Sequence, residues 1–458
     1  MTDGAVPTGR MRGLLTGSSL TARVLRSSAL TVVGFGVSQG LRLVSNLVLT
    51  RLLFPEAFGL MALVMVFMVG LAMISDIGTG PAIARSARGD DPTFLDTIWT
   101  VQIIRGVLLF FIGVILAYPL SEFYGEPQIF GMLVLGSSLF LVQGLMPTRR
   151  ETASRHLTLG LVTVLEILAL FIGFIILIVL AFWLRSVWAL VLGTVAATLV
   201  QVSLMTLFLP GHRNRLRLES EALREVIQFG KWILLSTFSG FLLMQGDKLI
   251  LGKFLPLDAF GTYNIGFFLG SFPMMLGVGV VVRFLIPVYR DCPPTASREN
   301  FLKIRKMRVL VTTALLMLLG PLAFMGPWLV DLMYDARYLS AGAVVVLIAC
   351  INIPALISLT YDQAALAAGD SRGYFVVSTT KALFVVLGLV IGVQTGGLVG
   401  ALIGQGLGII AAYPALVWLS SRLGVWDPLH DLGFAVLGLM LACGALWWNW
   451  DAIAALAA

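Results

Sequence analysis

Apolar runs long enough to cross a membrane as helices recur along the whole sequence. A spanning helix needs roughly 20 mostly apolar residues. Only 12% of the 458 residues are charged and 58% are hydrophobic, whereas soluble domains carry about 25% charged residues. A water-soluble chain of this length could not bury so much apolar surface. The sequence therefore predicts an all-α polytopic membrane protein, with thirteen spans at about 28–50, 57–84, 94–118, 129–147, 157–182, 187–209, 228–252, 260–287, 307–327, 341–366, 373–393, 397–420 and 431–450.

The basic residues indicate which loops face the cytoplasm. If the N-terminus is cytoplasmic, most of the 31 lysines and arginines fall in inward segments. The outward loops hold four, which are Arg51, Arg185, Lys253 and Arg337. An excess of basic residues in cytoplasmic loops is typical of membrane proteins. This asymmetry predicts a cytoplasmic N-terminus, and it explains the net charge of +7 without nucleic acid as a partner.

Residues 1–27 do not have the pattern of a cleavable signal peptide. They lack a continuous apolar core and a small-residue cleavage site. Basic residues such as Arg10 and Arg23 flank leucines and a valine. This pattern is typical of an amphipathic segment on the cytoplasmic face of the membrane, and a disordered basic tail explains it equally well.

One short loop sequence occurs twice. LTRLLFPEAFG (49–59) and LGKFLPLDAFG (251–261) each connect two predicted spans on the outer face. The prolines suit a helix boundary, and Glu56 and Asp258 suit the first turn of the following helix. Phe58 and Phe260 are placed to anchor at the membrane interface.

Six predicted spans separate the two copies, so the two halves of the chain cross the membrane in the same direction. This is a parallel repeat, related by a pseudo-two-fold axis along the membrane normal. The predicted domains are a basic N-terminal segment (1–27), an N-lobe of spans 1–6 (28–227), a C-lobe of spans 7–12 (228–420) and an extra C-terminal span (421–458).

Glycine recurs at a spacing of four residues from Gly388 to Gly408. Such stripes of small residues allow helices to approach closely in lipid. The stretch GFGVSQG (34–40) resembles a dinucleotide loop but lies inside a span, so we dismiss that interpretation. The three cysteines and three histidines are too scattered for a metal site, and no P-loop occurs. We expect no cofactor and no metal.

Ionisable residues inside spans are the candidate functional residues, because such groups are costly in lipid and mark cavities or pathways. They are Arg42, Asp76, Arg105, Glu166, Lys231, Asp247, Lys248, Arg283, Asp362 and Lys381. Cations outnumber anions, which favours an anionic ligand. Among polar neutral side chains, Asn46 and Gln102 would hydrogen-bond a sugar or join helices.

Several of these candidates also have structural explanations. Lys248 and Asp247 would neutralise each other, and the long side chain of Lys381 could reach the interface. Asp76 opens SDIGTGP, which suits a hinge or an ion pair with Arg42. Glu166 and Asp362 would bind a coupling proton or sodium ion.

The chain resembles the polysaccharide-transporter branch of the multidrug/oligosaccharidyl-lipid/polysaccharide flippase superfamily. The resemblance is carried by RLLFPEAFGLMAL (51–63), SDIGTGPAI (75–83), FGKW (229–232) and DKLILGKFLPLDAFGTY (247–263). It implies two six-helix lobes in a V around a central cationic cavity, with one or two extra C-terminal helices and 12–14 spans in all.

The resemblance also implies a function. Its members move undecaprenyl-pyrophosphate-linked oligosaccharide from the cytoplasmic to the outer leaflet of the bacterial inner membrane, by alternating access. Arg42, Arg105 and Lys381, helped by Lys248, Asn46 and Gln102, would then bind the head group. Asp76, Glu166, Asp247 and Asp362 would serve gating or ion coupling. A polysaccharide polymerase and export machinery are implied partners.

Other functions stay open at this point. A multidrug exporter of the same architecture should favour acidic side chains for cationic drugs. A polysaccharide polymerase or glycosyltransferase should carry a large outer loop with clustered acids or histidines, and a non-transporting scaffold is a further alternative. We expect a transporter rather than an enzyme.

Overall fold

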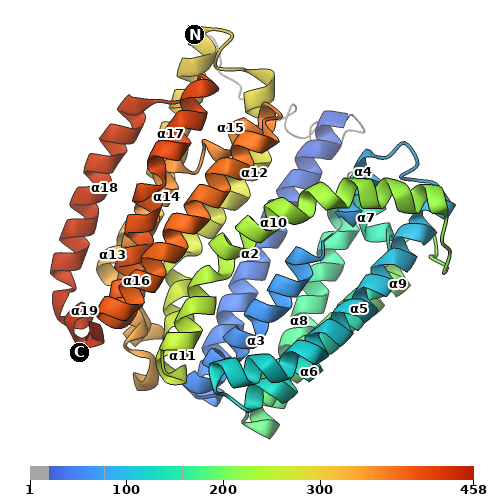
Figure 1. Ribbon diagram of the computed structural model, residues 1–458, viewed down its shortest axis with the longest axis horizontal. Helices are drawn as coiled ribbons and strands as arrows, with labels where there is room; N and C mark the ends of the chain where they lie inside the picture. Colours follow the sequence, from blue (N-terminus) through green and yellow to red (C-terminus); the bar gives the residue numbers. More distant parts are fainter. Residues whose placement is uncertain (1–19, 77, 157, 458) are drawn as a thin grey trace, which may run out of the picture. The chain divides into compact units, whose positions relative to one another are not determined.

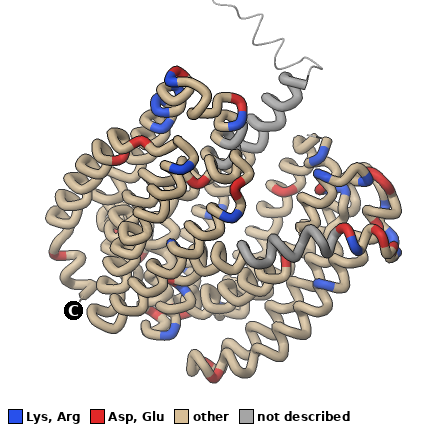
Figure 2. Tube along the Cα trace, turned by 45° about the horizontal axis from the view of Figure 1, so that its top comes forward, with Lys and Arg blue, Asp and Glu red and all other residues tan. Residues whose placement is uncertain are grey.

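The structure is a computed structural model that describes residues 20–76, 78–156 and 158–457, without the side chains of 20–32, 226–236, 280, 282–284, 286 and 287. The described residues form α-helices, one short 3₁₀ helix and connecting loops (Figure 1). Charged residues gather near helix ends and loops, and long tracts of the helices carry none (Figure 2). This pattern belongs to an all-α membrane protein.

The chain divides into two compact units. Among the described residues, unit 1 comprises those of 20–53 and 67–235, and unit 2 comprises those of 54–66 and 236–457. The boundary after Leu235 falls inside a long helix, and the predicted division into lobes at 227 stays a prediction. Residues 1–19 of the predicted amphipathic segment lie outside the described residues, as do the side chains of Lys231 and Arg283.

Unit 1 is built from helices that pack mainly against their neighbours in sequence. Helix α5 packs against α6, α8 against α9, α2 against α8, and α6 against α9. The helices are α2 (Leu20–Leu52), α3 (Pro55–Ile74, from residue 67 in this unit), α4 (Thr79–Arg85), α5 (Pro92–Tyr124), α6 (Gln128–Gly144), α7 (Arg149–Arg155), α8 (Leu159–Leu184), α9 (Trp188–Phe208) and the start of α10 (Ser220–Phe254).

Unit 2 is organised around one central helix, α14 (Ala341–Ser358), which packs against α11, α13, α16 and α18. Its apolar residues from Ala341 to Ala349 are all buried. The other elements are α11 (Leu257–Gly270), α12 (Phe272–Asp291), α13 (Arg298–Met333), η1 (Ala336–Tyr338), α15 (Asp362–Ala367), α16 (Ser371–Ala411), α17 (Tyr413–Arg422), α18 (Pro428–Trp448) and α19 (Trp450–Ala457).

Length and composition identify fewer spans than the thirteen that the sequence predicts. The described residues contain 8 helices apolar and long enough to cross a membrane, or 9 if the bent pair α6 and α7 forms one span. One of the eight is the 52-residue stretch 371–422, which the sequence divides into two spans near Gly396. The other unmatched spans stay predictions.

The glycine stripe folds this stretch back on itself. The backbone leaves helical geometry at Gly396 and Gly397, and Gly397 has φ 56°, a conformation that favours glycine. Beyond this turn the two halves of α16 touch backbone to backbone. A Cβ on Gly392 would lie 2.1 Å from the carbonyl oxygen of Gly400. The predicted close helix approach, and the turn near Gly396, are therefore confirmed.

The two copies of the repeated loop also meet, within unit 2. A Cβ on Gly59 would lie 2.4 Å from the Leu257 carbonyl oxygen, and a Cβ on Gly261 would lie 1.9 Å from the Pro55 carbonyl oxygen. The two contacts are reciprocal, since Pro55 and Leu257 hold equivalent positions in the repeat. A local two-fold relation would produce such a pair, although the pseudo-two-fold repeat of the whole chain stays a prediction.

The helix boundaries in this loop are as predicted, but the role of one phenylalanine is not. Helix α3 begins at Pro55, and Glu56 and Asp258 lie in the first turns of α3 and α11. Phe260 is fully buried and stacks on Tyr263, so its prediction as an interface anchor is wrong. The reason is that its ring packs inside unit 2 beside Tyr263 and Gly252 of α10, where an added Cβ on Gly252 would lie 3.4 Å from Phe260 Cε1.

The hairpin contact yields a stability prediction. Gly392→Ala should lower the thermal unfolding temperature of the purified protein, because the added methyl group cannot fit against the Gly400 carbonyl oxygen; overpacking of this kind costs about 1–3 kcal/mol. Gly433→Ala in α18 is the matched control, since no atom lies within 4 Å of the added methyl group. Equal stability of the two variants would contradict the hairpin packing.

Candidate functional site

A break in the second predicted span opens the candidate site in unit 1. Helix α3 ends at Ile74 and α4 begins at Thr79. Gly78 adopts φ 68°, and its N–H donates to Asp76 Oδ1 at 2.9 Å. The end of a helix leaves carbonyl groups without partners inside the helix. The SDIGTGP segment thus produces free polar backbone groups within an apolar span.

Arg105 of α5 binds the free end of α3. Its Nη2 donates to the Ala72 carbonyl oxygen at 2.6 Å, and its Nε donates to Ser75 Oγ at 3.0 Å. A cation suits this position because the C-terminal end of a helix carries partial negative charge. Both partners are neutral groups, so these contacts do not cancel the charge of the guanidinium.

Gln102 makes the equivalent contact with α6, one turn away on the same helix. Its Nε2 donates to the Gln143 carbonyl oxygen at 3.0 Å and to the Met146 carbonyl oxygen at 3.3 Å. Helices α5 and α6 approach closely here, since a Cβ on Gly106 would lie 2.4 Å from the Phe140 carbonyl oxygen. The predicted residues Gln102 and Arg105 therefore share one helix face.

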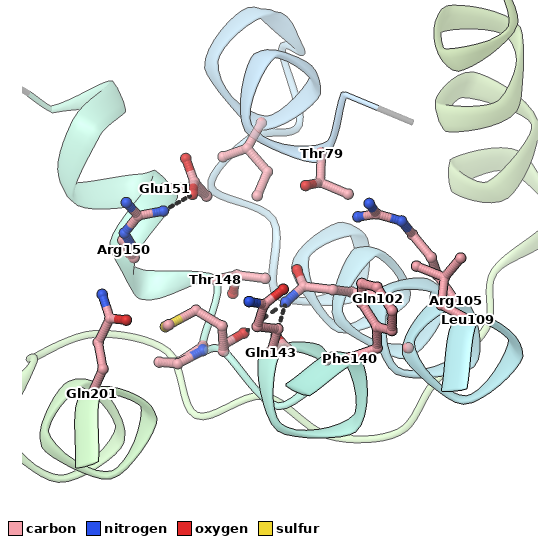
Figure 3. A pocket seen from close by; sticks show the side chains of 15 residues that line it. Thr79, Gln102, Arg105, Leu109, Phe140, Gln143, Thr148, Arg150, Glu151 and Gln201 are labelled. Carbon is pink, nitrogen blue, oxygen red and sulfur yellow. Dashed lines mark hydrogen bonds and ion pairs between the residues drawn. The ribbon is translucent and has the colours of Figure 1, made fainter. Parts of the chain in front are cut away.

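This face lines a cavity of about 320 Å³ within unit 1 (Figure 3). Figure 3 shows the Arg105 guanidinium and the amides of Gln102, Gln143 and Gln201 around it. The wall is formed by Thr79, Ile83, Gln102, Arg105, Gly106, Leu109, Phe140, Gln143, Gly144, Met146, Pro147, Thr148, Arg150, Glu151 and Gln201. Within the described part of the chain, the side chains of Gln143 and Gln201 have no hydrogen-bond partner.

Arg150 and two glutamates form a second charged group at this cavity. Arg150 pairs with Glu151 at 3.2 Å and with Glu166 of α8 at 3.0 Å. The structure thus brings the predicted ion-coupling residue Glu166 against a cation. Sequence reasoning missed Arg150 because it lies in a predicted loop, and Gln201 because a lone amide in a span gives little signal.

The predicted residues of α2 lie in the same unit but do not line this cavity. Arg42 is exposed, and among the described residues no carboxylate lies within ion-pair distance of it. Asn46 is half-buried. The suggested pair between Arg42 and Asp76 is wrong, because Asp76 turns back onto Gly78 and lies near Arg105 instead.

In unit 2, two predicted residues with separate assigned roles form one ion pair. Lys381 of α16 binds Asp362 at 2.8 Å. Asp362 is the first residue of α15, which follows a break after α14. Each charge therefore has a partner within the same unit, and neither is an isolated group in its span.

Asp247 and Lys248 take different partners although they are adjacent in sequence. Asp247 is buried and accepts a hydrogen bond from the Tyr263 hydroxyl. Lys248 Nζ lies 4.9 Å from the centre of the Phe267 ring and 3.4 Å from Gln245 Oε1. The two side chains do not meet as an ion pair, since successive helical residues point in different directions, and their mutual neutralisation stays a prediction.

Curated relatives are named for polysaccharide production. The chain is 23% identical to the teichuronic acid biosynthesis protein TuaB of Bacillus subtilis, over 71% of this chain and 67% of that protein. It is 24% identical to the amylovoran biosynthesis protein AmsL of Erwinia amylovora, over 54% of this chain and 64% of that protein. It is 22% identical to the succinoglycan biosynthesis transport protein ExoT of Rhizobium meliloti, over 63% of this chain and 57% of that protein. The matches thus span about two thirds or less of these relatives.

Solved transporters share the fold. The lipid II flippase MurJ, in an inward closed conformation, aligns with a TM-score of 0.64 at 11% identity, covering 93% of this chain and all of that chain (100%). An inward-facing multidrug-resistance transporter of the MATE family, in the MOP superfamily, aligns with a TM-score of 0.62 at 15% identity, covering 86% and 98%.

A family model described as polysaccharide biosynthesis protein matches residues 48–343. The match covers the repeated loop, the broken helix α3–α4 and the whole cavity wall of unit 1. It also confirms the resemblance that the sequence motifs carry. The chain belongs to the polysaccharide biosynthesis protein family, and its fold is similar to the folds of the MurJ flippase and the MATE-family transporter.

Proposed function

We propose that this membrane protein translocates an undecaprenyl-pyrophosphate-linked oligosaccharide from the cytoplasmic to the outer leaflet of a bacterial inner membrane. The family supports this role, because relatives are named for teichuronic acid, amylovoran and succinoglycan biosynthesis or transport. The fold supports it too, because MurJ is named as a lipid II flippase. Both are similarities, and the glycan carried by this chain is unassigned.

The physical task of such a protein is to shield a head group from hydrocarbon. Oligosaccharide hydroxyls and a pyrophosphate lose their hydration in lipid, at a cost of several kcal/mol for each unpaired group. A protein removes this barrier by offering replacement hydrogen bonds in a cavity. The polyprenyl chain is apolar and can remain in the bilayer.

The observation that carries the proposal is the set of unused polar groups around the unit 1 cavity. Arg105 retains its positive charge, and its Nη1 has no hydrogen-bond partner among the described residues. The Gln143 and Gln201 amides are also unpaired there. Guanidinium groups match phosphate oxygens in pairs, and amides both donate to and accept from sugar hydroxyls.

We assign roles to the remaining predicted residues within this function. Arg42, Asn46, Lys248 and Lys381 would contact the head group along its path, and Asp76, Glu166, Asp247 and Asp362 would serve gating or ion coupling. Arg42, Arg105 and Lys248 lack a carboxylate within ion-pair distance among the described side chains. This favours an anionic cargo over the cationic drugs of a multidrug exporter.

A leaflet assay tests the function directly. Depletion of the protein should make lipid-linked oligosaccharide accumulate in the cytoplasmic leaflet, where it is protected from a glycan-modifying enzyme added outside. Accumulation in the outer leaflet would contradict the proposal and favour a polymerase. A change in drug susceptibility with normal glycan export would favour the multidrug exporter.

The unpaired amides give a prediction that separates binding from folding. The double variant Gln143→Ala/Gln201→Ala should reduce transport at least tenfold, the effect of about 1.4 kcal/mol lost in head-group contacts. Its thermal stability should match the wild type, because neither side chain has a protein partner to lose. The control is Gln128→Ala, which changes an exposed glutamine of α6 outside the cavity. Equal transport by the wild type, the double variant and the control would exclude this cavity as the head-group site.

Arginine chemistry gives a second prediction. Arg42→Ala and Arg105→Ala should abolish transport and leave membrane insertion intact. Arg105→Lys should keep the cation near the end of α3 but lose the paired donors that match phosphate, so its transport should be intermediate. Full transport in both alanine variants would overturn the proposed contacts.

A further inference from the structure

A histidine is fully buried at the start of α18 in unit 2, outside the cavity described above. The side chain of His430 has no exposed surface. Its Nδ1 lies 2.8 Å from Asp431 Oδ1, and its Nε2 lies 3.2 Å from Thr312 Oγ1 of α13. The centres of the His430 and Phe434 rings lie 4.8 Å apart. Both ring nitrogens therefore have a hydrogen-bonding partner.

Asp431 is held as a hydrogen-bond acceptor by three side chains. Besides His430, the Tyr361 hydroxyl donates to Oδ1 at 2.8 Å and the Tyr413 hydroxyl donates to Oδ2 at 2.5 Å. These contacts fix the Asp431 carboxylate between α18, α17 and the turn after α14, with Oδ1 beside the His430 ring.

Two arginines of α13 lie near the start of α18. Arg305 forms an ion pair with Asp427. Arg308 donates to the Val425 carbonyl oxygen and lies 4.2 Å over the Tyr361 ring. The titratable and charged groups around the start of α18 are Tyr289 (α12), Arg305 and Arg308 (α13), Tyr361 (the turn after α14), Tyr413 (α17), and Asp427 and Asp431.

Asp427 is ionised in this arrangement. Burial alone would raise the pKa of Asp427, but hydrogen bonds from Arg305 and from the His430 backbone N–H outweigh burial and hold that pKa below its usual range. Asp427 is therefore paired with Arg305, and the nearby charge of Arg308 also favours its charged form.

Thr312 allows either charge state of the ring. A hydroxyl can donate to the neutral Nε2 and can accept from the protonated Nε2–H. The ring would gain or lose its proton without changing partners, and histidine is the side chain that ordinarily changes charge between about pH 5 and 8. We propose that His430 and Asp431 form a proton-binding site of the transporter, linked through Tyr361 to the Asp362–Lys381 pair.

The link is short and lies entirely within unit 2. Tyr361 is buried in the turn between α14 and α15, and its hydroxyl both donates to Asp431 and accepts from the Asp427 backbone N–H at 3.2 Å. The next residue, Asp362, binds Lys381. A change of charge at His430 alters the field at Asp431 and so the position of Tyr361, which ends the turn directly before Asp362 at the start of α15.

The link to transport rests on the proposed function, but proton binding itself is measured without it. The full chain would be placed in lipid nanodiscs with ¹³C-labelled histidine, and the signals of the three histidines assigned through His156→Gln and His212→Gln. The His430 ring signal should shift between pH 5 and 8, and Asp431→Asn should change that response. Asp90→Asn, at the partner of the exposed His156, should change only the His156 signal. A His430 signal that is constant over this range would overturn the site.

The link to Lys381 is tested by transport in proteoliposomes at several pH values. The wild-type rate should depend on pH, and this dependence should be lost in His430→Gln and in Tyr361→Phe. The second variant keeps the aromatic ring under Arg308 and removes only the hydroxyl. Tyr118→Phe, at an exposed tyrosine of unit 1, should keep the wild-type profile. Wild-type pH profiles in both test variants would overturn the link. A wild type that moves no lipid-linked oligosaccharide would instead refute the proposed function, and the histidine signals would still decide proton binding.

Discussion

Polar groups within an apolar environment must find partners inside the protein, and in unit 1 the partners are mostly the ends of helices. Arg105 binds the end of α3, and Gln102 binds the end of α6. Arg155 donates to three carbonyl oxygens at the end of α4. Each contact satisfies carbonyl groups that the helix cannot satisfy itself.

This constraint explains why the broken span and the candidate cavity coincide. The SDIGTGP break creates free backbone groups, and these require a donor from a neighbouring helix. Arg105 supplies it, and these hydrogen bonds position its guanidinium at the cavity wall (Figure 3). The contact that stabilises the break therefore also orients the cation that we propose for ligand binding.

The apolar runs, the glycine stripe and the break at SDIGTGP could be predicted from the sequence because each is a local pattern with a local physical cause. Gln102 and Arg105 could be recognised as one face because they are three residues apart on a helix. The partners could not be predicted. Glu166 meets Arg150 of α7, a segment that the sequence predicts as a loop, and Asp362 of α15 meets Lys381 of α16. The sequence gives no sign of either partner.

Two other misjudgements have the same origin. Phe260 is buried because its ring packs beside Gly252 and Tyr263 inside unit 2. His430 attracted no attention because it lies in a predicted loop, yet loop and helix ends close over it to form a buried network. Burial depends on tertiary packing, which residue spacing alone does not contain.

Native mass spectrometry of the protein purified from its own membrane tests the central claim most directly, because it identifies the bound lipid without assuming its structure. We expect a polyprenyl diphosphate that carries a saccharide, retained by the wild type and lost from Arg105→Ala. Ordinary phospholipids alone, bound equally by both proteins, would contradict the account.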